Sequence, residues 1–467
     1  MSENTGTASK TRHQKYLQLR DKYAFFEFTD FSYALNENEL KVTYHFNLSD
    51  TYHFYPSFNI PRKKFYNHFP DENDLKSDIY QQLLFHIGLI ELISYWKIAC
   101  PPLILIKPYK LNKLQVEWWK NLYFNGLGEF FYTNGIQAHM EDFVEIKAEG
   151  KTIKPFHIQL ADDVIVPVGG GKDSVVTLEL LKQTEKVKPF IINPRGATLA
   201  CAAVAGFAED EIITVNRRLD PLMLELNTQG FLNGHTPFSA LLAFYGILIS
   251  TVSGIKNIAL SNESSANEPT VAGTQVNHQY SKSFAFEKDF RNYIHRYISE
   301  DYNYFSFLRP LSELKIAQLF AKQVKYYPVF KSCNVGSKTD TWCCNCPKCL
   351  FAFTILSPFI PTDELAHIFG KNLFEMPQML PYFKELTGIA DIKPFECVGT
   401  VDEVNAALQA YIHTQKFKKY PLLLEYYTNL EIHKEFSPQN AELILNMFDG
   451  NHFLSPRFLK ILQKAIK

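Results

Sequence analysis

The chain has almost no net charge, because its 467 residues include 48 Lys and Arg against 49 Asp and Glu. No basic field over the whole molecule therefore draws it to nucleic acid, and we expect no nucleic-acid partner. Residues 1–15 are polar and lack the apolar core of a secretion signal. We expect them to form a flexible tail on a cytoplasmic protein.

Long hydrophobic runs are also scarce. The stretch that tests this statement is 238–255, which carries no charged residue and reaches the lower length limit of a membrane-spanning helix. It contains several Ser, Thr and Gly residues and lies between two predicted strands of one sheet. We therefore predict a buried core helix and no membrane partner.

Residues 163–174 read D-V-I-V-P-V-G-G-G-K-D-S and predict a phosphate-binding loop. The β-branched run at 164–168 is typical of a buried strand, and the apolar pattern that follows Ser174 is typical of a helix with one buried face. The glycines between them would let backbone N–H groups approach a phosphate at the positive end of that helix. Lys172 would add a positive charge, and Ser174 would add a hydroxyl donor.

Two commoner glycine loops are absent. A Walker A loop would need Gly and then Ser or Thr where Val166 and Asp173 stand, and a dinucleotide fingerprint would need Gly in place of Ser174. The loop instead resembles the S-G-G-x-D-S motif of the N-type ATP pyrophosphatases, or PP-loop enzymes, with Gly169 in place of the first Ser. The resemblance implies that ATP is split between its α and β phosphates. The nucleotide-binding residues that it implies are Gly169, Gly170, Gly171, Lys172, Asp173 and Ser174. The alternative is an ordinary strand–turn–helix corner.

Beyond the tail, the chain divides into three regions. Residues 16–155 alternate between strand-like and helical patterns and predict an N-terminal α+β accessory domain. Residues 156–355 predict an α/β core with a parallel sheet, which contains the ATP-binding loop and a cysteine cluster. Residues 356–467 predict a helical C-terminal region, in which 394–400 is the one compact non-helical feature.

Local patterns place individual elements within these regions. A hairpin is predicted around the turn N-E-N, and helices are predicted at 79–98, 113–123 and from 401. The predicted core strands are 164–168, 189–192, 211–215 and 257–260. Ligands bind beyond the carboxyl ends of parallel strands, so the rule points to the segments 169–174, 193–195, 216–218 and 261–266.

The eight cysteines are unevenly spread, since five of them lie between Cys333 and Cys349. The ligand-like series is Cys333, Cys343, Cys346 and Cys349, and its last three members have C-x-x-C-x-x-C spacing. Four thiolates close a tetrahedral zinc site and leave no open position, which predicts a structural Zn²⁺. The spacing resembles the zinc site of 7-cyano-7-deazaguanine synthase, another pyrophosphate-loop enzyme. The alternatives are a metal-free thiol cluster and an iron–sulfur cluster.

Further segments, read together, resemble one family more closely. The matching segments are G-H-T-P-F-S-A, S-N-E-S-S-A-N-E, V-N-H-Q-Y-S-K-S, R-P-L-S-E, W-C-C-N-C-P-K-C and K-P-F-E-C-V-G-T. In this order, between about 163 and 400, they resemble the UDP-N-acetyl-α-D-muramoyl-L-alanyl-L-glutamate epimerases. Where that pattern has Gly between the first two clustered thiols, this chain has Cys344.

The resemblance implies an adenine nucleotide α-hydrolase-like core and an isomerase of peptidoglycan precursor synthesis. Such an enzyme converts the terminal L-Glu of UDP-MurNAc-L-Ala-L-Glu to D-Glu, uses ATP with Mg²⁺, and releases AMP and pyrophosphate. A carboxylate strongly disfavours loss of its α-proton, because the carbanion would lie beside an anion. Adenylation removes that charge, and inversion then needs a proton donor or acceptor for both faces of the carbon.

The candidate acid–base groups are His235, His278, Lys282, Glu263 and Glu268, among which we predict His278 and Lys282 as catalytic. His278 and Lys282 are four residues apart and would share one face of a helix. His titrates near neutrality, and burial can bring a Lys towards it. A core histidine and a phosphate- or carboxylate-binding lysine are the plainer interpretations.

Asn262, Glu263 and Arg309 are predicted to bind the substrate. Asn262 and Glu263 follow the end of a predicted strand, where a cap or turn role is the alternative. Arg309 would hold a carboxylate or phosphate with two hydrogen bonds, or else a structural acid.

Two other functions compete with the epimerase. One is another AMP-forming PP-loop enzyme, either a ligase or a modifying enzyme that thiolates tRNA or forms a deazapurine nitrile. The other is a zinc-stabilised nucleotide-binding protein without turnover. Release of pyrophosphate from ATP with candidate substrates separates the three.

Overall fold

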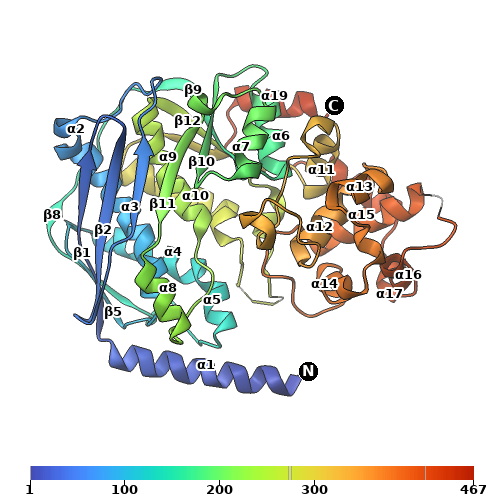
Figure 1. The fold of residues 1–467 in the computed structure, drawn as a ribbon, viewed down its shortest axis with the longest axis horizontal. Helices are drawn as coiled ribbons and strands as arrows, with labels where there is room; N and C mark the ends of the chain where they lie inside the picture. The colour runs from blue at the N-terminus through green and yellow to red at the C-terminus, as the bar shows by residue number, and fades with distance from the viewer. Residues whose placement is uncertain (1, 272, 275, 416) are drawn as a thin grey trace.

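The computed structural model describes residues 2–271, 273, 274, 276–415 and 417–467, with side chains described from residue 11 onward. The described chain is an α/β structure around one eleven-stranded sheet, with a helical C-terminal region beside it (Figure 1). The strand order is β13-β12-β9-β10-β11-β4-β2-β1-β5-β7, and β3 pairs with β2. The short strands β6 and β8 form a separate pair.

The strands have the following bounds. They are β1 Phe25–Leu35, β2 Glu39–Leu48, β3 Tyr52–Phe54, β4 Ser57–Pro61, β5 Leu103–Ile106, β6 Tyr109–Lys110, β7 Glu145–Ala148, β8 Lys151–Thr152, β9 Ala161–Pro167, β10 Val187–Ile192, β11 Ile213–Arg218, β12 Ile255–Leu260 and β13 Asn303–Ser306. The four predicted core strands are confirmed as β9 to β12, and the predicted hairpin is β1 with β2. β13 was not predicted, because four residues carry too short a pattern.

The helices that precede the C-terminal region are α1 Ser2–Lys22, α2 Glu72–Lys76, α3 Asp78–Trp96, α4 Lys113–Gly126, α5 Gly128–Thr133, α6 Lys172–Leu181, α7 Gly196–Val204, α8 Pro221–Thr228, α9 Phe238–Ser253, α10 Phe284–Tyr297 and α11 Glu313–Ala321. Those that follow are α12 Pro347–Leu356, α13 Thr362–Phe369, α14 Leu380–Leu386, α15 Val401–Thr414, α16 Leu422–Thr428, α17 Glu431–Glu435, α18 Pro438–Asn446 and α19 Pro456–Ala465.

The sheet joins two parts of the chain that the sequence analysis treated separately. Strands β13, β12, β9, β10 and β11 run parallel to their neighbours, and β4 then pairs antiparallel with β11, from Asn59 opposite Asn216 to Ser57 opposite Arg218. The boundary predicted at residue 155 is therefore not a break between two sheets. Local patterns do not reveal a pairing between strands so far apart in the chain.

Both faces of the parallel part are covered, as its apolar strands require. Along β9, Val164 and Val166 belong to one hydrophobic core, and Ile165 belongs to the other. α3 and α9 contribute to the core that contains Ile165, whereas α6 and α11 contribute to the opposite one. Alternate side chains of β9 therefore pack against the helices of both layers. This packing fixes the end of β9, from which the glycine loop begins.

Residues 238–253 of the uncharged stretch form α9, and the side chains of this helix are mostly buried in the core, as predicted. Among the helices of the described ranges, none combines the length and the apolar character that a bilayer crossing needs.

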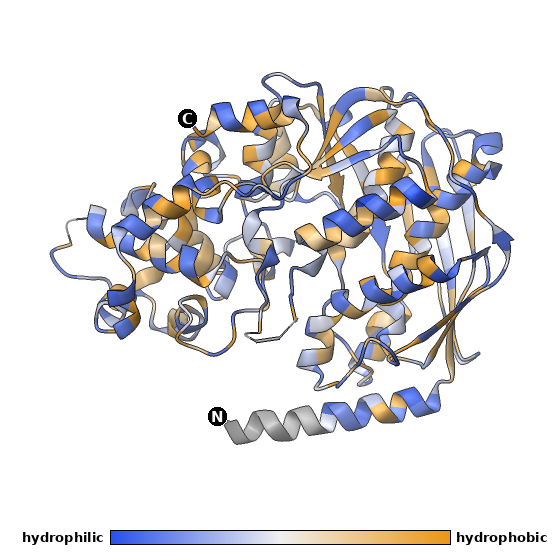
Figure 2. Cartoon of the chain, turned by 180° about the vertical axis from the view of Figure 1, so that it is seen from behind, coloured by the Kyte–Doolittle hydropathy of each residue, from blue (hydrophilic) through white to orange (hydrophobic). Residues whose placement is uncertain are grey.

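The N-terminal residues differ from the prediction, because 2–15 lie in α1 and not in an irregular tail. Figure 2 shows this helix along one end of the molecule, with mostly hydrophilic residues in its coloured part. Tyr16 and Leu19 are buried, and the Arg12 guanidinium donates to the Thr133 carbonyl at 2.9 Å. These contacts anchor the helix from its C-terminal half.

Candidate active site

The glycine loop lies between the end of β9 and the start of α6, as predicted. Gly170 has φ +81°, and a Cβ atom there would approach the backbone of Ala197 to 3.1 Å, so the turn requires glycine. A Cβ atom on Gly169 would meet nothing within 4 Å, which leaves that backbone open to a ligand. β9 lies between β10 and β12, where the direction of chain crossover reverses, and this is the position at which such sheets bind ligands.

Lys172 does not extend into open solvent. Its side chain is buried and forms ion pairs with Asp173, at 2.5 Å, and with Glu313. Burial alone would lower the pKa of Lys172, but the two carboxylates raise it above its ordinary value. The positive charge predicted for a phosphate is therefore held within a group of acids at the start of α6.

Three carboxylates meet beside the loop. Ligand oxygens of Asp173, Glu263 and Glu313 all lie within 4.8 Å of one another. Burial raises the pKa of Glu313 well above its usual range, while Lys172 acts in the opposite direction and the neighbouring acids add to the rise. Clustered carboxylate oxygens are the donors that Mg²⁺ prefers. Glu313 belongs to the R-P-L-S-E segment, but the sequence analysis gave it no role.

Two predicted substrate residues lie beyond β12. The Asn262 amide donates to the Ser306 hydroxyl at 3.0 Å, and Glu263 is almost fully buried in the acidic group. Asn262 therefore connects the ends of β12 and β13, whereas Glu263 points its carboxylate towards the loop.

Arg309 does not present a free guanidinium to a substrate. Its side chain is 0% exposed, pairs with Glu287 at 3.0 Å and donates to the backbone carbonyls of Glu263 and Lys282. The direct substrate contact predicted for Arg309 is not what this geometry supports, because a substrate would have to displace these partners. Arg309 instead holds two other candidate residues in position.

A pair of histidines shares one carboxylate. His278 Nδ1 hydrogen-bonds to Glu129 on α5, and His235 Nδ1 lies 3.5 Å from the same Glu129 oxygen. The two imidazole rings are 4.4 Å apart. Burial, the charge of His278 and that of Lys97 lower the pKa of His235 to about 3. Two neighbouring titratable groups whose pKa values are shifted apart by their environments are suited to acid–base chemistry. The sequence gave no signal for Glu129, which comes from the N-terminal region.

His278 and Lys282 do not lie on one α-helix, so the helix face that their spacing would have allowed them to share does not form. Lys282 ends a short 3₁₀ helix, Tyr280–Lys282, and His278 precedes it. Burial alone would lower the pKa of His278, but hydrogen bonds to Cys397 and Glu129 raise it to about 9. For Lys282, burial is outweighed by Cys397, Glu263 and Asp173, so its pKa rises. The expected tuning of Lys282 towards neutrality is therefore wrong, because three anionic groups surround it.

Cys397 is the functional candidate that the sequence analysis missed. Both His278 and Lys282 hydrogen-bond to its thiol, so the two predicted catalytic residues converge on it. Its signal was present in the P-F-E-C-V-G-T segment, which the resemblance included without assigning a role. Glu268, another acid–base candidate, is engaged by an ion pair with Lys393.

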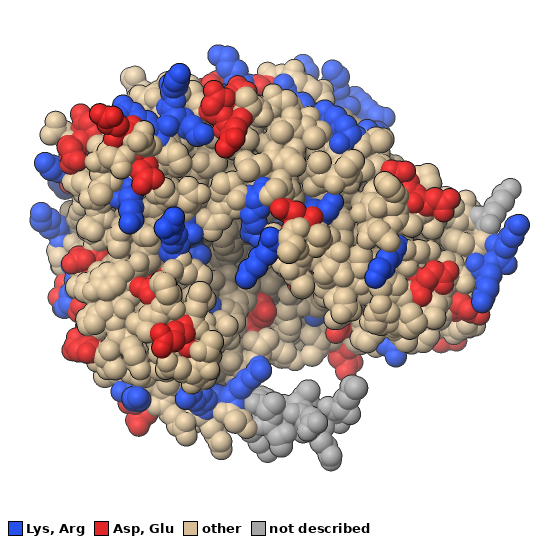
Figure 3. Space-filling view, in the orientation of Figure 1, with Lys and Arg blue, Asp and Glu red and all other residues tan. Residues whose placement is uncertain are grey.

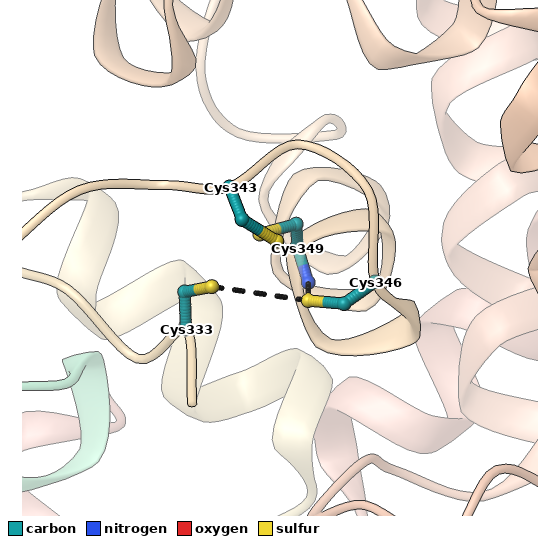
Figure 4. Close-up of side chains that lie close together, drawn as sticks. All are labelled: Cys333, Cys343, Cys346 and Cys349. Atoms are coloured by element: carbon teal, nitrogen blue, oxygen red, sulfur yellow. Dashed lines mark hydrogen bonds between the residues drawn. The ribbon is translucent and has the colours of Figure 1, made fainter. Parts of the chain in front are cut away.

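The thiol cluster forms as predicted in its four members (Figure 4). Cys333 Sγ lies 3.9 Å from Cys346 Sγ, and Cys343 Sγ lies 3.8 Å from Cys349 Sγ. A tetrahedron of zinc–sulfur bonds of about 2.3 Å has sulfur–sulfur edges of about 3.8 Å, so the donor set fits Zn²⁺. The Cys344 thiol instead donates to the Phe369 carbonyl at 3.1 Å. Its φ of +51° explains why glycine suits this position in the family pattern.

Figure 3 shows a recess near the centre of the face in view, between the C-terminal helices and the rest of the molecule. Lys and Arg side chains stand at its rim. The loop and the acid–base residues come from two parts of the sequence. α5, α6 and the segment before α10 lie before the C-terminal helical region, and Cys397 lies within it.

Comparison with known proteins adds the family. The MurL N-terminal domain model matches residues 18–307, and the MurL C-terminal domain model matches residues 329–441. These models divide the chain between 307 and 329, whereas the sequence analysis placed its boundaries at 155 and 355. No solved structure matches the chain.

Three relatives carry the name UDP-N-acetyl-alpha-D-muramoyl-L-alanyl-L-glutamate epimerase. The protein from Xanthomonas oryzae pv. oryzae is 35% identical over 387 residues, which are 80% of this chain and 84% of the relative. The protein from Salinispora tropica is 36% identical over 68% of this chain and 70% of its own length, and that from a Micromonospora species is 34% identical over 71% and 75%. The resemblance noted in the sequence is thereby confirmed, and the chain belongs to the family of UDP-N-acetyl-α-D-muramoyl-L-alanyl-L-glutamate epimerases.

Proposed function

We propose that this protein is an ATP-dependent epimerase of peptidoglycan precursor synthesis. It would convert the terminal L-Glu of UDP-MurNAc-L-Ala-L-Glu to D-Glu through an acyl-adenylate and release AMP and pyrophosphate. One observation carries the proposal: the Glu263 carboxylate lies within 4.8 Å of that of the loop residue Asp173, and Arg309 donates to the backbone carbonyls of both Glu263 and Lys282. The proposed phosphate-binding loop and the proposed acid–base residues would therefore serve one bound substrate.

The nucleotide would bind at Gly169, Gly170, Gly171, Lys172, Asp173 and Ser174, in a core of the adenine nucleotide α-hydrolase type. The open backbone at Gly169 and the start of α6 support this assignment, because N–H groups and the helix dipole favour phosphate there. Both proposed substrates carry several negative charges, which the Lys and Arg side chains at the rim of the recess would attract.

Mg²⁺ would be held by Asp173, Glu263 and Glu313, whose oxygens are close enough to share one ion. When bound, it would offset negative charge on the phosphates. The Lys172 ammonium already lies between two of these carboxylates, those of Asp173 and Glu313, and would orient them.

The substrate carboxylate would react next to Lys282. Adenylation converts this carboxylate to an acyl phosphate, so that removal of the α-proton gives an enolate in place of a dianion. The raised pKa of Lys282 keeps it cationic at neutral pH, where it would stabilise negative charge on the acyl oxygen. We assign substrate positioning to Asn262 and Glu263, with Arg309 holding the backbone of Glu263.

His278 would supply a proton to the α-carbon. A pKa of about 9 means that it is charged at neutral pH, and because Nδ1 contacts Glu129, the nitrogen for proton transfer would be Nε2, which faces Cys397. Water would then cleave the inverted adenylate. Because ATP and UDP-linked precursors are required together, we propose the cytoplasm as the place of reaction.

The four thiols Cys333, Cys343, Cys346 and Cys349 would hold a structural Zn²⁺. All four positions of the tetrahedron would be filled by protein, so the ion would stabilise the segment before α12 without activating water.

The test is incubation with ATP, Mg²⁺ and UDP-MurNAc-L-Ala-L-Glu, followed by chiral analysis of the glutamate released by acid hydrolysis. We expect D-Glu together with AMP and pyrophosphate, and no inversion with the α,β-methylene analogue of ATP. Free L-Glu should be a poor substrate, since the nucleotide and sugar supply binding energy that positions the carboxylate. Inversion without ATP would exclude the adenylate mechanism, and AMP formation with unchanged L-Glu would indicate a ligase.

A further inference from the structure

The segment around Cys397 is held in place from two directions. On one side, the Lys393 N–H donates to the Thr270 carbonyl at 3.2 Å, and the Gln279 amide donates to the Val398 carbonyl at 3.1 Å. On the other side, Thr400 caps α15. Cys397 is therefore fixed beside the segment that carries His278 and Lys282.

Cationic side chains surround the Cys397 sulfur. Burial alone would raise the pKa of this thiol, but Lys282, Lys348 and His278 together lower it well below its ordinary value. The acidic side chain of Glu396 also faces this group, and burial raises its pKa. Cys397 remains partly exposed, so a substrate can reach it.

Cys201 shows how burial changes the pKa of a thiol that lacks a group of cationic neighbours. It lies beside the glycine loop, where its thiol donates to the Gly170 carbonyl at 3.6 Å. Burial raises its pKa to about 12, although Lys331 acts in the opposite direction. The environment of Cys397 is thus a specific arrangement and not a general property of cysteines in this fold.

Lys282 fixes where the thiol stands relative to the nucleotide loop. It is hydrogen-bonded to Cys397 and electrostatically coupled to Asp173 and Glu263. A substrate carboxyl group paired with Lys282 would therefore lie near both the loop and this sulfur.

We propose that Cys397 is the proton-transfer group on one face of the glutamyl α-carbon. This inference rests on the function proposed above and adds a residue to it. The thiolate would take the α-hydrogen as a proton, and the C–H electron pair would become the π bond of an enolate with its charge on the acyl oxygen. A protonated group on the opposite face then donates to the same carbon, and the thiol returns its proton through His278 or solvent. In the reverse direction the thiol is the donor.

The first test separates activation of the substrate from proton transfer. Exchange of labelled pyrophosphate into ATP in the presence of UDP-MurNAc-L-Ala-L-Glu measures adenylation, whereas epimerisation and uptake of deuterium from heavy water measure proton transfer. For Cys397→Ser and Cys397→Ala we expect pyrophosphate exchange close to the wild-type rate and epimerisation reduced about 100-fold or more. Isotope exchange starting from one of the two epimers should be lost as well. Cys100→Ser is the matched control, because that thiol is buried and donates to the Lys97 carbonyl at 3.3 Å, outside the glycine loop; it should retain all three reactions.

The possible results are distinct. Epimerisation at the wild-type rate in Cys397→Ser would overturn the inference, and so would parallel loss of pyrophosphate exchange and epimerisation in both variants. A wild-type enzyme that shows no pyrophosphate exchange with this substrate would instead refute the proposed function.

The second test uses the unmodified holoprotein. Between pH 6 and 8, the rate at which iodoacetamide alkylates Cys397 should rise much less than tenfold per pH unit, because only the thiolate reacts and the neighbouring cations favour it. Cys201 should remain unlabelled in the peptide mass spectrum, and ATP with the substrate should protect Cys397. A labelling rate that rises about tenfold per pH unit would reveal an ordinary thiol and overturn the inference.

Discussion

Replacing Glu129 by Gln tests the electrostatics of the histidine pair. The substitution removes one negative charge next to His278 and keeps an oxygen that accepts its hydrogen bond. In the wild type the His278 pKa is raised from 6.5 to about 9, although burial acts in the opposite direction. This rise means that the folded protein stabilises the protonated imidazole relative to the neutral one by about 3 kcal/mol. Glu129 is one of two groups that produce it, so we expect the pKa in Glu129→Gln to fall by about one unit or more.

The pKa should be measured directly and not through stability. A raised His278 pKa stabilises the fold below pH 6.5, and this contribution is lost as the pH rises through 9. The lowered Cys397 pKa stabilises the fold above the ordinary thiol value, and this contribution is lost as the pH falls through the lowered one. As the pH rises from 6.5 to 9, the His278 contribution falls while the Cys397 contribution grows, so the two changes offset each other. The free energy of unfolding should therefore change little with pH on their account.

The assay is an NMR titration of the His278 Cε1–H signal, assigned from the spectrum of His278→Gln. Glu149→Gln serves as the control, because Glu149 is an exposed carboxylate paired with Lys107 at 3.0 Å. The midpoint should be near 9 in the wild type and in the control, and lower in Glu129→Gln. An unchanged or higher midpoint in Glu129→Gln would refute the reasoning.

Three further predictions concern the loop, the thiols and the buried arginine. Asp173→Asn should abolish pyrophosphate release and leave the circular dichroism spectrum unchanged, because the residue acts on the nucleotide; near-normal turnover would contradict the nucleotide assignment. Elemental analysis should find about one zinc per chain, and Cys346→Ser should lose both the metal and thermal stability, whereas Cys344→Ser should retain the metal. Arg309→Met should lower the free energy of unfolding in urea by about 3–5 kcal/mol, because it leaves Glu287 charged and buried without its partner; a change below about 1 kcal/mol would argue against the buried pair.

The sequence predicted well those features that a continuous stretch specifies. The apolar run before Gly169 and the glycines themselves define a strand and a turn locally, and the cysteine spacing predicted which four thiols meet. Glu129 could not be predicted, because 149 positions separate it from His278 and its own neighbours form no motif. Arg309 was assigned a substrate contact because burial and the presence of Glu287 are properties of the packed structure, which the residue type alone does not reveal.

The pairing of β4 with β11 has a consequence for anyone who wishes to divide this protein. A fragment that starts near residue 156 would keep the glycine loop but would lose β4, so the outer edge of β11 would expose unpaired N–H and C=O groups from Asn216 to Arg218. Open strand edges recruit other chains. We expect such a fragment to self-associate, and the half that contains the glycine loop therefore cannot be used as a separate module.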